Sequence, residues 1–545
     1  NNKDELIKSL SDQIDMFSKK LKIDAHASAF MKHNRETISY QTCCSLMIDI
    51  LSAGWQITLG IEGFLISQPE YTEMFKGSTM SEVKDKMREV QLVNRNKQLL
   101  SYETIKFIER MEKPKNVGNE KKSILSIIDS GKELSEIFKD IASLDKDKKI
   151  SLLKKIIVPE ISICFPDEPL FKEEELYCPY TGLRLADIWR YLRLTWSSEL
   201  KSVPGKSLPI LIRNAARTNK PIIGIAMLRS AALSDEARDT YIGWFNEKTI
   251  RDKIYNKELK VDFVVDQMLK VLDEKINQIR HDDFKFLNKE LIKNPNENII
   301  NKLNKTYDEE VEKRRQNLKF EKVSVVRITS NDSVDWLQQS EIPLFRKKRA
   351  LKLARLLEAR KSFNDVNLKK QPARGYATLI HSSNKKGNEI ISRALREIKI
   401  KALSENIMDL SVCGSIAPYN EILGGKLVAS LITSQEIREL FKKRYSSKKY
   451  QKPSIIASSN KGKPVYRDAN LLCLTTTSLY GVSSSQYNRI KFLRKNFNYL
   501  ENDLIWKEVF KKDSSSHKTK GQGVYHISDI TSKLLNIITR KVLKR

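Results

Sequence analysis

Two segments of this sequence carry residues whose types and spacing could bind phosphate groups. The first runs from Arg346 to Lys361, where eight of 16 residues are lysine or arginine and only Glu358 is acidic. Leucines within this run could pack a helix against a core and leave the cations to contact a phosphate backbone. A solvated helix face is the ordinary interpretation of such a run. We predict a nucleic-acid-binding helix whose phosphate contacts are Arg346, Lys347, Lys348, Arg349, Lys352 and Arg355.

Further phosphate contacts are expected from a second basic run nearer the C-terminus. Its cations are Lys442, Lys443, Arg444, Lys448 and Lys449. Aromatic residues are interleaved with the charges, and such rings can stack on the bases of a single strand. The candidates for this role are Tyr445, Tyr450 and Tyr480.

The second phosphate-binding candidate is the stretch from Ser411 to Ser430, which reads as a strand, a turn and a helix opened by Gly424 and Gly425. Glycines at a helix start let backbone N–H groups approach a phosphate where the helix dipole favours negative charge. The alternative is a plain helix entry with a tight helix–strand contact. If a ligand binds here, the predicted wall is Tyr419, Asn420, Gly424, Gly425 and Lys426, with Arg238 and Trp244 in the pocket and no catalytic residue assigned.

Other chemistries find little support in the sequence. The stretch from Val203 to Ser207 resembles the end of a phosphate-binding loop, but Leu200 stands where that loop needs a glycine. The six histidines are scattered, and a nearby pair, His26 and His33, has no cysteine partner. We therefore expect neither a metal site nor a cofactor.

The charge balance of the 545-residue chain points to a polyanionic partner. It has 98 lysines and arginines against 68 aspartates and glutamates, for a net charge of +30. Residues 342–545 hold 42 of these cations and 15 of the anions, which is an excess of 27. Such a field attracts nucleic acid by releasing counterions, although membrane surfaces and acidic proteins carry the same sign.

Composition favours a cytoplasmic protein without a membrane partner. Hydrophobic residues make up 40% of the chain, and its six cysteines show no disulfide-rich or metal-binding spacing. The most apolar window, Leu46 to Ile66, is interrupted by charged residues and glycines. It predicts a buried helical hairpin in place of a membrane span.

Periodicity predicts a mixed α/β fold with four regions. They are a helical N-terminal domain (1–165), the first part of an α/β core (166–247), a long charged helical insert (248–322), and a strongly basic second part of the core with C-terminal helices (323–545). The insert reads equally well as a solvated spacer or as an interaction arm. Short strands are expected at 221–228, 323–328, 410–413, 454–457 and 471–475, with helices at 183–195, 343–359, 388–403 and 427–445.

Four stretches together resemble the DruA family of Druantia anti-phage defence proteins. They are Ser207–Arg217, Pro221–Ala226, Arg238–Trp244 and Ala417–Leu427, within a resemblance that covers about 177–244 and 323–487. The resemblance implies a bacterial, intracellular defence protein that works beside a large helicase-like partner and further subunits. It supplies no settled catalytic residues.

The strand, glycine pair and helix also look like the acyl-CoA pocket of GNAT-type acetyltransferases. Glu421 and Lys426 depart from that pattern, because a carboxylate repels a pyrophosphate and lysine replaces a small residue. A GNAT-like core without that cofactor is therefore the expectation.

Three hypotheses for function follow. The first is a nucleic-acid-binding subunit of a Druantia-like defence assembly, with DNA as the foremost ligand. The second is an enzyme that acts on nucleic acid or a nucleotide at the glycine turn. The third is a protein-docking scaffold whose basic half meets an acidic protein.

Overall fold

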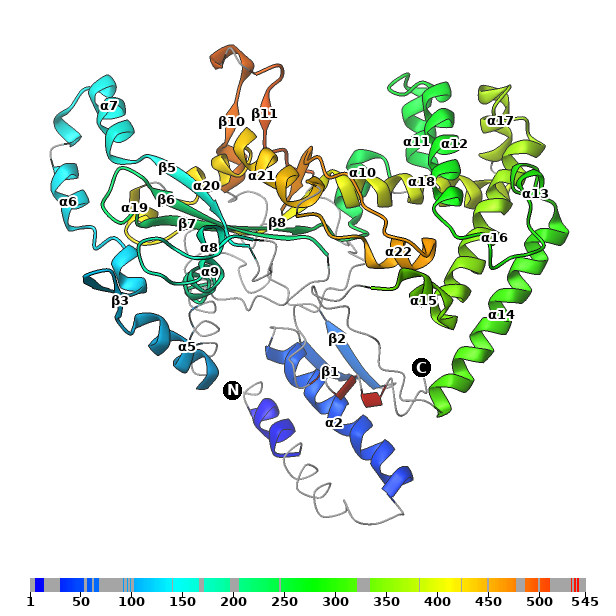
Figure 1. Ribbon diagram of the computed structural model, residues 1–545, viewed down its shortest axis with the longest axis horizontal. Coiled ribbons are helices and arrows are strands. Elements are labelled where there is room, and N and C mark those ends of the chain that lie inside the picture. Colours follow the sequence, from blue (N-terminus) through cyan, green and yellow to red (C-terminus); the bar gives the residue numbers. More distant parts are fainter. Residues whose placement is uncertain are drawn as a thin grey trace. The chain divides into compact units, whose positions relative to one another are not determined.

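The computed structural model describes the chain in two compact units, Asn1–Glu89 with Thr519–Arg545 and Val90–Lys518 (Figure 1). The described residues are 5–13, 30–52, 56–60, 63–67, 92, 96, 99, 102–139, 141–165, 171–196, 205–244, 247–320, 334–381, 383–422, 424–447, 450–476, 486–497, 500–509, 531, 534–535 and 537–538. Residues 90–165 therefore belong to the unit that contains the main sheet.

The first unit combines helices with a β-hairpin. Residues 5–13 are helical, and α2 (Phe30–Ser52) precedes β1 (Gln56–Gly60) and β2 (Gly63–Ser67). The expected helical hairpin across 46–66 is wrong beyond Ser52. The strands pair antiparallel and are closed by Gly60 opposite Gly63, so glycines that interrupt the apolar window mark a turn between strands.

The second unit is built on a mixed five-stranded sheet, which confirms the predicted α/β class. In spatial order the strands are β5 (Pro159–Ile163), β6 (Ser207–Asn214), β7 (Ile222–Ser230), β8 (Ile407–Ser415) and β9 (Cys473–Thr475). All neighbours are antiparallel except β8 and β9, which run parallel. The strands expected at 221–228, 410–413 and 471–475 are confirmed.

Both faces of this sheet are covered by helices. Ile210 and Ile212 of β6 face one core, and Leu211 between them faces the other, as alternation along a strand requires. The first core is closed by α20 (Lys426–Leu431) and α21 (Gln435–Ser446), and the second by α5 (Tyr102–Glu112) and α9 (Leu185–Arg193) (Figure 1).

A second set of helices forms its own hydrophobic core, which we call the helical lobe. Its helices are α11 (Glu247–Tyr255), α12 (Val261–Asn277), α13 (Lys289–Lys293), α14 (Glu297–Phe320), α16 (Pro343–Asp365), α17 (Pro372–Leu379) and α18 (Lys385–Glu405). Met268, Leu303 and Leu353, from α12, α14 and α16, are fully buried in one cluster. The charged insert is thus packed against the basic helix, which excludes a solvated spacer, and an interaction role for the insert stays a prediction.

Shorter elements complete the second unit. The helices are α6 (Lys132–Lys139), α7 (Lys146–Ile156), α8 (Glu173–Leu176), α10 (Glu236–Ile242), α15 (Trp336–Glu341), α19 (Tyr419–Ile422) and α22 (Ile455–Lys461), and the hairpins are β3 (Lys115–Val117) with β4 (Glu120–Lys122) and β10 (Lys491–Phe492) with β11 (Leu504–Ile505). The strand expected at 454–457 is wrong, because Ser454 starts α22 and Gly462 ends it in a left-handed conformation. The strand expected at 323–328 lies outside the described residues. Within the described part of the chain, no helix is long and apolar enough to cross a membrane.

The shared core of the helical lobe predicts that insert and basic helix stabilise each other. We expect Leu303→Ala in α14 and Leu353→Ala in α16 each to lower the free energy of unfolding of the lobe by about 2–5 kcal/mol, because each leaves a cavity. Urea unfolding followed by circular dichroism measures this. Leu337→Ala, at a half-exposed position of α15, is the control and should cost much less.

Candidate nucleic-acid interface

Three of the six cations predicted on the basic helix share one face of α16. Lys348, Lys352 and Arg355 are spaced by four and three residues, which places them on the same side of a helix. Lys348 and Arg355 are exposed. Lys352 is partly exposed and donates from Nζ to Glu397 Oε2 at 3.2 Å. This face can reach a ligand in solvent.

Arg349 is fully buried, which corrects its assignment as a surface phosphate contact. Its guanidinium donates to the carbonyl oxygen of Ser459 at 3.1 Å and pairs with the Asp283 carboxylate. Burial lowers the pKa of Arg349, and Asp283 opposes that shift. A cation held in this way joins α16 to α22 and to the segment after α12.

The charged insert brings two further cations to the start of the basic helix. Desolvation lowers the pKa of Lys347, and Arg314 and Arg315 of α14, with Lys348, lie close enough to lower it further. Arg314, Lys347 and Lys348 form no ion pair with any described residue. We call Arg314, Arg315, Lys347 and Lys348 the α14–α16 cluster.

Glu310 explains why this cluster forms at this end of the two helices. Its buried carboxylate accepts from Lys313 Nζ at 3.0 Å and lies 3.7 Å from an Nη of Arg346. Glu310 therefore links α14 to α16. It forms an ion pair with Arg346, which is a predicted phosphate contact. Sequence patterns could not single out Arg314 and Arg315, because their proximity to α16 depends on tertiary packing.

The second basic run is largely engaged with the protein itself. Lys442 is exposed, but Lys443 pairs with Glu175 at 3.3 Å, and the buried Arg444 donates to the carbonyl oxygen of Tyr450 at 2.6 Å. Lys448 and Lys449 lie outside the described residues.

The aromatic residues proposed to stack on bases are similarly placed. Tyr445 exchanges hydrogen bonds with the backbone of Ser207, and Tyr450 is buried in a stack with Phe171. Tyr480 lies outside the described residues. Neither described tyrosine presents an open ring to a ligand.

The glycine turn opens a helix as expected, with Gly425 immediately before α20 and Gly424 at φ 55°. The approach to Gly425 is filled by the side chain of Gln486, since a Cβ built on this glycine would lie 2.0 Å from Gln486 Oε1. Asn420 donates to the adjacent Glu421 at 2.8 Å, and Lys426 is exposed. This geometry favours the tight packing contact over a phosphate cradle.

Tyr419, assigned to the same turn, is instead the centre of a buried polar network. Its hydroxyl accepts from Asn214 Nδ2 and donates to Asp129 Oδ2, each at 3.0 Å. Burial raises the pKa of Tyr419, with Asp129 adding to the shift and Asn214 opposing it. Two of the stretches that carry the family resemblance, at Asn214 and Tyr419, thus meet in space.

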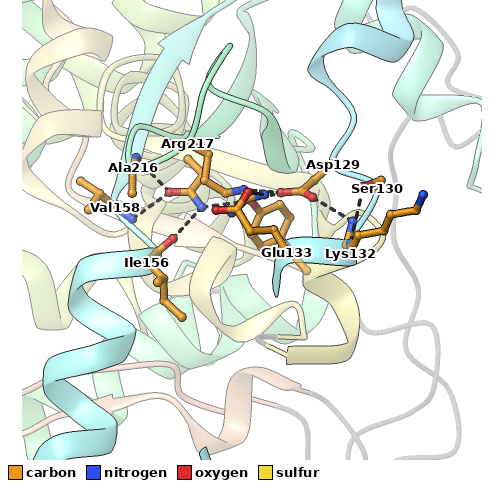
Figure 2. A network of polar contacts seen from close by, with 11 residues as sticks. Asp129, Ser130, Lys132, Glu133, Ile156, Val158, Ala216 and Arg217 are labelled. Atoms are coloured by element: carbon orange, nitrogen blue, oxygen red, sulfur yellow. Dashed lines mark hydrogen bonds and ion pairs between the residues drawn. The ribbon is translucent and has the colours of Figure 1, made fainter. Parts of the chain in front are cut away.

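Figure 2 shows how this network continues on both sides. The Asn214 side chain accepts from the backbone of Val158 and Ala216 and donates to Ile156, so it closes the junction between α7 and the sheet. Asp129 also pairs with Arg217 Nε at 2.7 Å, and Arg217 Nη2 donates to Glu133 at 2.8 Å. The polar side-chain groups of Asn214, Tyr419 and Asp129 all have partners, as expected of a structural network.

The predicted pocket residues Arg238 and Trp244 also form hydrogen bonds with other parts of the protein. The buried Arg238 donates from Nε and Nη2 to Asp239 Oδ1 at 2.9 and 2.7 Å, and Lys399 of α18 donates to the other oxygen of Asp239 at 2.8 Å. The backbone N–H of the partly exposed Trp244 donates to the carbonyl of Asp239 at 2.6 Å. These bonds tie α10 to the helical lobe.

Lys206, from the stretch that lacks the glycine of a phosphate-binding loop, also contacts other parts of the protein. Its Nζ donates to the carbonyl oxygen of Ser404 at 2.5 Å, at the end of α18, and lies over the rings of Phe441 and Tyr445. Desolvation lowers the pKa of Lys206 to about 8; Glu405 opposes the shift and Arg467 adds to it. Among the described residues, no group of His, Cys, Asp and Glu is arranged to hold a metal ion.

The fold and surface define a mixed α/β protein in which a helical lobe carries the α14–α16 cluster of cations. A model of the family described as Druantia protein DruA matches residues 183–264 and 392–540. The Druantia protein DruA of Escherichia coli (strain UMEA 4076-1) is 42% identical over 86 residues, which span 16% of this chain and 19% of that protein. No solved structure matches the chain. These matches assign residues 183–264 and 392–540 of the chain to the DruA family.

The buried network predicts a stability role for the Tyr419 hydroxyl. Tyr419→Phe should lower the free energy of unfolding by about 1–3 kcal/mol, because Asn214 and Asp129 each lose a buried hydrogen-bond partner. Urea unfolding measures the loss, with Tyr466→Phe at an exposed position as the matched control. Equal stability of the two variants would contradict a structural role for the network.

The lowered pKa of Lys206 predicts a pH-dependent contribution to stability. Because the unfolded chain binds this proton more tightly than the folded chain, stability from this group rises as pH increases from about 8 towards 10.5. Lys206→Met should flatten that part of the stability–pH curve and add stability mainly at the low-pH end. Melting temperatures of the wild type, of Lys206→Met and of the exposed control Lys442→Met, measured from pH 7 to 10, test this. A difference in melting temperature between Lys206→Met and the wild type that stays the same at every pH would refute it.

Proposed function

We propose that this chain is a nucleic-acid-binding subunit of a Druantia-type anti-phage defence system in the bacterial cytoplasm. The proposal rests on family membership, on the excess of cations after residue 342, and above all on the α14–α16 cluster. A helicase-like protein and further subunits would be its partners. DNA is the foremost ligand.

The α14–α16 cluster carries the proposal because it is unfavourable without a ligand. Desolvation is the main cause of the lowered pKa of Lys347, and repulsion by Arg314, Lys348 and Arg315 adds to that shift. A phosphate backbone would relieve this repulsion and release counterions. Lys352 and Arg355 extend the same surface along α16. Contacts of this type position a nucleic acid without reading its sequence.

The enzyme hypothesis receives no comparable support. Its phosphate wall depended on Tyr419 and Gly425, and these residues pack against Asn214, Asp129 and Gln486. The scaffold hypothesis is kept as an outcome of the binding experiment, because an acidic protein would also be attracted to the cluster.

Replacing Arg314, Arg315, Lys347 and Lys348 by glutamine should weaken binding to nucleic acids of different sequence by similar factors. Each lost phosphate contact should reduce the slope of log affinity against log salt by about 0.9 for duplex DNA and about 0.7 for single strands. Fluorescence anisotropy with labelled duplex DNA, single-stranded DNA and RNA across a salt series measures both quantities.

The control variant neutralises Lys139, Lys146, Lys154 and Lys155, which are exposed on α6 and α7. It removes the same net charge from another surface, so it separates a local interface from a general charge effect. Equal losses in both variants, or wild-type binding that does not depend on salt, would contradict the proposed interface. Absence of nucleic-acid binding with retained assembly on an acidic partner would favour the scaffold.

A further inference from the structure

The turn between α11 and α12 presents two aromatic rings to solvent. Tyr255, the last residue of α11, is 87% exposed, and Phe263 in the first turn of α12 is 57% exposed. Neither ring stacks on a described aromatic side chain. The next two residues, Val264 and Val265, are buried, so Phe263 occupies the outer side of a helix whose inner side is already packed. Exposed aromatic rings can serve as stacking surfaces for the bases of an unpaired strand.

The turn is held in one conformation by its own hydrogen bonds. The N–H of Glu258 donates to the carbonyl of Lys253 at 2.9 Å, and that of Lys257 donates to Ile254 at 3.1 Å. This pair of bonds closes a helix end around a residue in the left-handed region, where glycine is usual. Lys257 occupies that position with φ 60°. Lys257 thus stands at a position where glycine would be less strained.

Most charges of the turn neutralise each other. Lys253 pairs with Glu258 at 3.1 Å, and Arg251 lies 3.9 Å from Asp252. The exposed Lys257 and Lys260 form no ion pair with any described residue, and Asp262 is the remaining anion. The turn thus offers two rings and two cations, and stacking must supply most of its binding energy.

We propose that this turn binds an unpaired base of a single-stranded nucleic acid, with Tyr255 and Phe263 as stacking surfaces and Lys257 and Lys260 beside the backbone. The inference rests on the proposed nucleic-acid binding and names a ligand class for it. Bases within a duplex already stack on their neighbours, so an exposed ring gains most from a base that is unpaired. Lys257 and Lys260, which form no ion pair with any described residue, favour an anionic partner at the turn.

The turn is rigidly connected to the α14–α16 cluster. Val264 and Val265 of α12 belong to the same hydrophobic cluster as Leu353 of α16 and Leu303 of α14. The spacing between the rings and the cations is consequently fixed by one core.

The test compares Tyr255→Ala/Phe263→Ala with wild type in the full chain, by anisotropy with labelled oligothymidylate and with a duplex of equal length. We expect single-strand affinity to fall about fivefold or more, with duplex affinity and both salt slopes unchanged. Tyr466→Ala, at another exposed tyrosine, should change neither affinity. Circular dichroism melts confirm that the variants are folded.

Two further measurements locate the contact directly. A single strand carrying 5-iododeoxyuridine should crosslink on irradiation to the peptide that contains Tyr255 or Phe263, as read by mass spectrometry. Lys257→Gly should keep or raise the melting temperature while it weakens single-strand binding, because it removes the cation and relieves the backbone.

The outcomes separate this inference from the proposed function. If the chain binds nucleic acid through the α14–α16 cluster but the double variant binds single strands normally, the turn is not a stacking site and the proposed function stands. Equal losses for single strand and duplex would overturn base stacking. If the wild type binds no nucleic acid, the proposed function fails and the inference fails with it. Loss of a protein partner alone would assign the turn to protein docking.

Discussion

The pairing of β7 with β8 is the constraint from which the rest of the second unit follows. The two strands are hydrogen-bonded along their length, although all helices of the helical lobe lie between them in the sequence. The chain must leave the sheet after Ser230 and return to the neighbouring position at Ile407. An excursion of this kind can be stable only if it buries its own apolar surface, and the shared core of α12, α14, α16 and α18 does so.

The same pairing accounts for a glycine in each of the two strands. A Cβ on Gly224 would lie 2.6 Å from both the carbonyl oxygen of Gly414 and a methyl of Val428. A Cβ on Gly414 would lie 2.7 Å from the indole of Trp196. Glycine in β7 and β8 therefore lets α20 and Trp196 approach opposite sides of the paired strands. These positions are explained by packing and need no ligand.

Sequence patterns located most of the sheet and the helices, but they could not distinguish cations that fold the protein from cations that face solvent. The apolar run at 221–228 and the short strand candidate at 410–413 located β7 and β8, and the helix expected at 343–359 located α16. Periodicity could not show that Arg349 faces Asp283, since that carboxylate lies in a distant segment. It likewise missed Arg314 and Arg315, whose relation to Lys347 exists only once α14 packs on α16. Tyr255 was missed because exposure of a ring is a tertiary property.

The distinction between these cations explains how a strongly basic chain can fold and still attract a polyanion. Arg349, Arg238 and Lys399 have close carboxylate partners, so their charges are neutralised where water is excluded. Arg314, Lys347 and Lys348 lack such partners among the described residues and lie where solvent can screen them. Their mutual repulsion costs the folded protein some stability in the absence of a ligand. Because Glu310 and the apolar core hold α14 against α16, the helices cannot separate to relieve that repulsion. Under the proposed function, a bound phosphate backbone would relieve this repulsion, and the free energy recovered would contribute to affinity.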